Sequence, residues 1–185
     1  MNIQPFLEQY PEQEVQLKSK KKITLPDDEF QELIHRHGGL CVQKGLFRIY
    51  TPEQSEKWTT LLSEAFDDLE GEVVAYGRDW MGRQFAKQIG QPMLVMVDIA
   101  EGDFYTTENS LEGFFNDDLI EYAEDTLQIE LFNTWNTKGV VLQPDEIVGY
   151  LVPLKLGGQD SVENRHVIDA EVDWELNKQL HQQTN

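Results

Sequence analysis

The chain contains 185 residues, of which 39% are hydrophobic, so it has enough apolar surface to fold around its own core. Its 34 acidic residues outnumber 15 basic ones, and the net charge of −19 disfavours binding to nucleic acid or to an anionic membrane surface. The longest apolar run, residues 93–97, is far shorter than the roughly 20 residues of a membrane-spanning helix. With one cysteine, no intrachain disulfide can form, and the first residues lack a secretory signal, so we expect a cytoplasmic protein.

The acidity is concentrated in the second half of the chain. Residues 93–185 carry 19 acidic and 4 basic side chains, against 15 and 11 in residues 1–92. Such a field attracts a basic partner and speeds the encounter at low salt. The alternative is that the charge serves only to keep the protein in solution.

Three elements are predicted in the first fifty residues. Apolar residues at helical spacing predict a helix over residues 3–10, and a second helix is expected from Pro26 to the glycine pair at 38–39. Residues 40–50 read as a strand pair broken at Lys44 and Gly45.

The next segment carries a strong signal for the start of a helix. Thr51 is a good cap, Pro52 suits the first helical position, and Gln54 can complete a capping box. Apolar residues at 3–4 spacing extend the predicted helix to Leu69, before Gly71.

Short β-rich runs follow, separated by glycine, aspartate and proline. Connections this short favour an antiparallel meander. The predicted strands cover residues 73–76, 83–88, 92–99 and 103–106.

Two further elements are expected after the meander. Asn109 can cap a helix, with Glu112 three residues later. Near the C-terminus, alternating apolar residues from Ile168 to Trp174 predict a strand with an acidic outer face. The predicted fold is α+β, a largely antiparallel sheet with several helices packed on it. The helix that follows Asn109 would bury an apolar face made of Leu111, Phe114, Phe115, Leu119, Tyr122 and Ala123.

We find no motif that predicts catalysis or a cofactor. His35, His37 and Cys41 lack the second ligand pair that a zinc site normally has. Adjacent carboxylates on a helix point about 100° apart, so a solvated face explains them better than a hydrolase site. We therefore expect a protein without catalytic residues, metal or cofactor. The carboxylate pairs are Asp67-Asp68, Asp117-Asp118 and Glu124-Asp125.

The acidic residues of the predicted 109–125 helix suggest a protein-binding surface instead. An inhibitor of a basic nuclease gains by mimicking phosphate, because it competes for the same cationic cleft. Aromatic side chains among the acids would supply anchors, although core packing is the alternative role for each tryptophan. The candidate acids are Asp117, Asp118, Glu121, Glu124 and Asp125, and the candidate anchors are Trp80, Trp135 and Trp174.

Three sequence blocks, residues 45–52, 76–82 and 147–158, are rich in turn-forming glycine and proline. With them the chain resembles the bacterial GAD-like family joined to the C-terminal domain of type VI secretion DNase-immunity proteins. The resemblance implies a GAD-like region over residues 1–108 and an immunity-type region over 109–185, packed as one unit. It also implies a non-enzymatic factor that binds and neutralises a cognate toxin, with a DNA-cutting effector as the best-understood target.

A second class of function stays open. A small-molecule or regulatory module would need a pocket between the helices and the sheet, which we would expect near Tyr76, Trp80 and Trp135.

Overall fold

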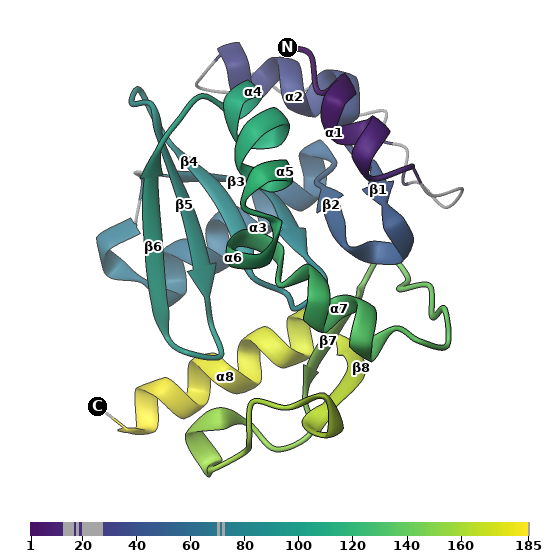
Figure 1. Cartoon of the computed structure of the whole chain (residues 1–185). Coiled ribbons are helices and arrows are strands. Elements are labelled where there is room, and N and C mark those ends of the chain that lie inside the picture. Colours follow the sequence, from purple (N-terminus) through teal and green to yellow (C-terminus); the bar gives the residue numbers. More distant parts are fainter. Residues whose placement is uncertain (13–16, 18, 20–27, 70, 72, 185) are drawn as a thin grey trace.

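The computed structural model describes residues 1–12, 17, 19, 28–69, 71 and 73–184. Within them, six strands form an antiparallel sheet in which each strand pairs with its neighbours in sequence (Figure 1). The order β1-β2-β3-β4-β5-β6 confirms the predicted meander and the α+β class. The strands are β1 (Cys41–Val42), β2 (Phe47–Ile49), β3 (Val73–Asp79), β4 (Gln84–Gln88), β5 (Met93–Asp98) and β6 (Asp103–Glu108).

A separate antiparallel pair, β7 (Glu146–Tyr150) and β8 (Arg165–Asp169), is attached at the end of β3. The N–H of Val148 donates to the carbonyl of Trp80 at 2.8 Å, and the guanidinium of Arg78 donates to the carbonyl of Pro144 at 2.6 Å. These bonds fix the pair against the large sheet.

The helices flank the sheet on both sides. Helices α1 (Gln4–Gln9) and α2 (Asp28–His37) precede β1, and α3 (Pro52–Ala65) lies between β2 and β3 in the chain. Pro26 falls outside the described residues. The segment after β6 holds α4 (Leu111–Gly113), the π-helical turn η3 (Phe114–Asp118), α5 (Leu119–Glu121), α6 (Ala123–Leu127) and α7 (Ile129–Trp135). The last helix is α8 (Ala170–Thr184), and the 3-10 turns are η1 (Gln43–Gly45), η2 (Asp67–Leu69), η4 (Leu154–Leu156) and η5 (Val162–Asn164).

Two layers cover opposite faces of the sheet (Figure 1). On one face, Phe115 packs edge-on against Phe47 at 5.7 Å, which attaches the segment from α4 to α6. On the other face, the hydroxyl of Ser55 on α3 donates to the carbonyl of Ala75 at 2.7 Å. Trp58 of α3 meets Trp174 of α8 at 5.6 Å, so both helices share that second layer.

The capping box is confirmed, but the helix that it begins is shorter than predicted. Thr51 accepts from the N–H of Gln54, whose side chain accepts from the N–H of Thr51. The helix ends at Ala65 rather than Leu69, because Phe66 is extended (φ −135°) and turns its ring onto Phe104.

The predicted helix over 109–125 is broken into short pieces. Ser110, not Asn109, is its cap, since the Ser110 hydroxyl accepts from the N–H of Gly113 at 2.9 Å. Asn109 instead donates to the carboxylate of Asp118 at 3.0 Å. Most of the predicted apolar face is buried, but Tyr122 is 55% exposed, because the π-helical turn shifts the register of the positions that follow.

The predicted strand through Trp174 is wrong beyond Asp169. The carboxylate of Asp169 accepts from the N–H groups of Glu171 and Val172, which caps α8 and ends β8. Val172 is therefore exposed on the helix, whereas Trp174 is buried. In a strand both side chains would lie on the same face, whereas the helix directs them to different sides.

Candidate partner-binding site

The helical layer from α4 to α6 is held in place by hydrogen bonds that other parts of the fold donate to its backbone carbonyls. The hydroxyl of Tyr10 donates to the carbonyl of Leu119 at 2.9 Å. Near the end of α6, the guanidinium of Arg83 donates to the carbonyl of Thr126 at 2.7 Å, and the indole of Trp80 to that of Leu127 at 2.8 Å. These bonds fix where the outward side chains of the layer lie.

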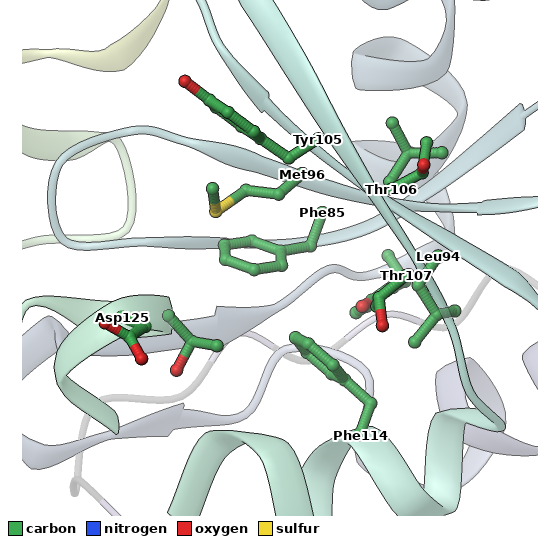
Figure 2. Close-up of a pocket in the computed structure, with 11 residues that line it drawn as sticks. Phe85, Leu94, Met96, Tyr105, Thr106, Thr107, Phe114 and Asp125 are labelled. Carbon is green, nitrogen blue, oxygen red and sulfur yellow. The ribbon is translucent and has the colours of Figure 1, made fainter. Parts of the chain in front are cut away.

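The layer leaves part of the sheet uncovered beside β6. The hollow there, which we call the β6 groove, holds about 160 Å³ between β5, β6 and the helical layer. Figure 2 shows Tyr105, Met96 and Phe85 lying in a row along the sheet, with Phe114 and Asp125 facing them from the helical layer. The lining is mostly apolar and consists of Tyr76, Phe85, Leu94, Val95, Met96, Tyr105, Thr106, Thr107, Phe114, Asp125 and Thr126.

Two tyrosines at the groove carry hydroxyl groups with shifted pKa values. Tyr105 is 49% exposed and donates a hydrogen bond to the carboxylate of Glu101 at 2.9 Å, which raises the pKa of Tyr105. Tyr76 is fully buried, and its hydroxyl has no hydrogen-bond partner within the described part of the chain. Burial, with the nearby charges of Asp118 and Glu29, raises the pKa of Tyr76 well above its ordinary value.

The predicted acidic residues follow this layer but do not form one uniform ridge. Asp117, Glu121 and Glu124 are exposed on η3, α5 and α6, and Asp125 is exposed at the β6 groove. Asp118 is only half-exposed, because its carboxylate accepts from Asn109.

The three candidate anchor tryptophans pack inside the protein to different degrees. Two of them are buried in the core, since Trp80 is 0% exposed and Trp174 is 1% exposed. Neither is therefore available on the surface as an anchor for a partner. Trp135 is half-buried on α7 and stacks on Trp80 at 6.0 Å. The pocket expected beside Tyr76 does contain Tyr76, but it lies nearer β6 and is not lined by Trp80 or Trp135.

The residues weighed for metal chemistry do not converge. Cys41 is buried on β1, His35 is exposed and His37 is half-buried, all near the end of α2. Among the described residues, no group of three or more histidine, cysteine or acidic side chains is arranged to hold a metal ion. In the same part of the chain, no helix combines the length and apolarity needed to cross a membrane.

Residues on β5 and β6 are the part of the site that the sequence did not indicate. The strand over 103–106 was predicted, but its position at the edge of the sheet was not. Tyr105 and Met96 share a face only because they are direct partners across the two strands. One available signal was that the chain after residue 108 reads as a helix, which leaves no strand directly after β6 to pair with it.

Comparisons with known proteins give a family match and a similar solved structure. Residues 108–181 match the family described as "T6SS immunity protein Tdi1, C-terminal", where T6SS denotes type VI secretion. Among solved structures, the chain resembles "Crystal structure of Atu4351 from Agrobacterium tumefaciens", with 18% sequence identity and a TM-score of 0.60, over 96% of this chain and 89% of that one. That likeness establishes a shared fold. No curated protein matches the chain. The segment from the end of β6 to α8 is thus similar to a type VI secretion immunity domain, which supports a toxin-neutralising role and a cognate toxin as partner.

Proposed function

We propose that this chain is a cytoplasmic immunity protein that binds a cognate secreted toxin and neutralises it without catalysing a reaction. One observation carries the proposal: the segment that matches the immunity family also forms the helical layer, which supplies one wall of the β6 groove through Phe114, Asp125 and Thr126. That segment, residues 108–181, contains 16 acidic and 4 basic side chains.

The outer surface is more acidic than the composition indicates, because several basic side chains are buried. Buried cations are not available for contact with a partner, which meets mainly the exposed carboxylates. They are Arg48, Arg78, Arg83, Lys87 and Arg165, each no more than 7% exposed.

This surface suits a basic toxin. A nuclease must carry a cationic cleft for the phosphates of DNA, and exposed carboxylates such as Asp117 and Glu121 can occupy such a cleft in their place. We therefore propose a basic nuclease as the target and an association rate that falls with salt.

The two regions, 1–108 and 109–185, are proposed to act as one body. Their buried apolar residues belong to one hydrophobic core, in which Phe6 of α1 contacts Phe115 of η3 at 5.1 Å. A partner that binds the helical layer therefore meets a surface supported by both regions.

The test begins with the tagged full-length chain in its source cells, captured at about 50 mM and about 300 mM salt. The protein that co-purifies and is encoded beside this chain is then expressed in a bacterial host, alone and together with the chain. We expect it to stop growth alone, and we expect growth to be restored when both are made. Toxicity that persists despite equal amounts of the folded chain would overturn the proposal.

The nature of the toxin and the role of the acids are tested with purified proteins. We expect the toxin to cut DNA and the chain to stop the cutting at equimolar amounts. The double substitution Asp117→Lys, Glu121→Lys should slow association at low salt. Glu8→Lys, Glu163→Lys changes the charge equally at two other exposed sites and serves as the matched control. Equal rates for the two variants would show that the helical layer is not the contact surface.

A further inference from the structure

The two edges of the large sheet differ in how they are protected. At the β1 edge, Glu12 forms a bridge with Val42, and the N–H of Gln43 donates to the carbonyl of Pro11 at 3.0 Å. At the β6 edge, the described residues contain no strand beyond β6 (Figure 1). An edge of this kind is a template for pairing with another chain.

The hydrogen-bonding direction along β6 can be assigned residue by residue. The N–H of Gly102 donates to the carbonyl of Asp98, which closes the hairpin onto the pair of Asp98 and Asp103. Because direction alternates along an antiparallel pair, Asp103, Tyr105 and Thr107 bond to β5. Phe104, Thr106 and Glu108 then direct their backbone groups outward.

One of these outward groups is already capped. The N–H of Phe104 donates to the carboxylate of Asp103 at 2.8 Å, which confirms its outward direction. Thr106 and Glu108 lie on the same edge and are exposed. The strand has no lysine, proline or bulge of the kind that natural edge strands use against unwanted pairing.

The β6 groove opens on the face of the same strand. Side chains alternate between the two faces, so those of Tyr105 and Thr107 lie on the groove side (Figure 2). Thr106 also borders the groove, but its side chain lies on the other face. A strand added about 4.8 Å from β6 would likewise present every second side chain to the groove. The volume of about 160 Å³ is below the roughly 300 Å³ of small-molecule pockets and suits one inserted side chain.

Charge selects among the chains that could pair here. The groove lining includes Asp125 and no lysine or arginine, and Glu101 and Glu108 are also exposed at this edge. A second copy of this chain paired through β6 would bring together two chains of net charge −19, each with Asp103 and Glu108 on the paired strand, and this like charge opposes the pairing. A basic segment meets no such repulsion.

We infer that an extended segment of the toxin pairs with β6 as a further strand, inserts one apolar side chain into the β6 groove, and carries a lysine or arginine two residues away. This mode of recognition takes affinity from main-chain bonds and specificity from alternate side chains. The inference rests on the proposed function, because it specifies how the toxin is held.

Hydrogen exchange of the full-length chain, with and without its co-purified toxin, tests the pairing directly. We expect the outward amides of Thr106 and Glu108 to exchange at least about tenfold more slowly in the complex. Unchanged exchange at both amides in a formed complex would overturn the inference while leaving the immunity role intact. Failure of the wild-type chain to bind or protect at all would instead overturn the proposed function.

Two substitutions separate an effect at the groove from a general effect of an added ring. Thr107→Trp places a bulky ring on the groove face, and we expect at least about tenfold weaker toxin binding. Thr60→Trp adds the same ring at an exposed position on α3, in the other layer, and should bind as the wild type does. Equal affinities for the two variants would contradict insertion into the groove.

A third variant tests the edge itself. Thr106→Pro removes an outward N–H, which edge strands tolerate, and it should weaken toxin binding with little change in melting temperature. If this variant does not fold, the two tryptophan variants and the exchange measurement still test whether the toxin pairs with β6. Sedimentation of the chain alone checks for a second copy: we expect a monomer, and a dimer that Thr107→Trp dissolves would show that the groove serves self-association instead.

Discussion

Arg83 and Asp79 form an ion pair of 2.6 Å although their side chains are only 5% and 0% exposed. The same aspartate accepts from the N–H groups of Met81 and Arg83 and so holds the turn between β3 and β4. Burial raises the pKa of Asp79, and the charge of Arg83 opposes that change.

Arg83→Met should therefore destabilise the protein strongly, because it leaves a buried carboxylate without its cation. We expect the free energy of unfolding to fall by about 3 kcal/mol or more, measured by urea denaturation. The double variant Asp79→Asn, Arg83→Met should recover part of this loss. A single variant within about 1 kcal/mol of the wild type would contradict the role assigned to the pair.

Asp173 on α8 should make the stability depend on pH. Burial raises the pKa of Asp173 to about 6 from an ordinary 3.8, Asp98 adds to the rise, and Asn177 and Arg165 oppose it. The folded state thus binds a proton more tightly than the unfolded state does, so this group lowers stability as the pH rises from about 4 to above 6. Asp173→Asn removes the effect.

The measurement compares the free energy of unfolding of wild type and Asp173→Asn at acid and neutral pH. We expect the variant to gain on the wild type by up to about 3 kcal/mol between pH 4 and pH 7.5. Parallel pH profiles for the two proteins would show that Asp173 titrates normally.

Gly45 should be intolerant of any side chain. Its φ of +104° is in the left-handed region, and an added Cβ would lie 2.7 Å from the Cβ of Leu142. Gly45→Ala should cost roughly 1–3 kcal/mol in the free energy of unfolding. Gly157→Ala is the matched control, since that glycine also has a positive φ (+86°) but nothing within 4 Å of the added atom. Equal losses would attribute the whole effect to backbone strain.

The capping box of α3 should contribute measurably to stability. Thr51→Ala removes a side-chain acceptor at the first turn and is expected to cost about 1 kcal/mol. Gln54→Ala removes the reciprocal bond, and a double-mutant cycle should show the two losses to be less than additive. Fully additive losses would indicate that the two bonds form independently.

Much of the fold could be predicted because its signals are local. The capping box at Thr51 and Gln54 lies within four residues, and short breaks between β runs leave adjacent antiparallel pairing as the simplest topology. The break in the helix over 109–125 has no such signal. It depends on tertiary contacts, such as the bond from Tyr10 to the carbonyl of Leu119, made across 109 positions of sequence.

The site was harder to predict than the fold, for the same reason. An acidic residue at the groove, Asp125, could be identified from charge alone. The neighbours of Asp125 could not, because Tyr105 and Phe114 come together only when β6 is the last strand and the helical layer leaves that end uncovered. The apolar pattern of residues 170–174 fits the two-residue period of a strand as well as the 3.6-residue period of a helix. The helix forms because Asp169 caps its first turn.

The bonds that hold the helical layer have a consequence for how this protein can change over time. The layer is attached through hydrogen bonds to its main-chain carbonyls, which are donated by Tyr10, Arg83 and Trp80. This attachment does not depend on the outward side chains of the layer. Mutations at Asp117 or Glu121 can therefore accumulate without loosening the layer. Related proteins could therefore match a toxin whose sequence changes by altering these exposed residues, while the fold beneath them stays the same.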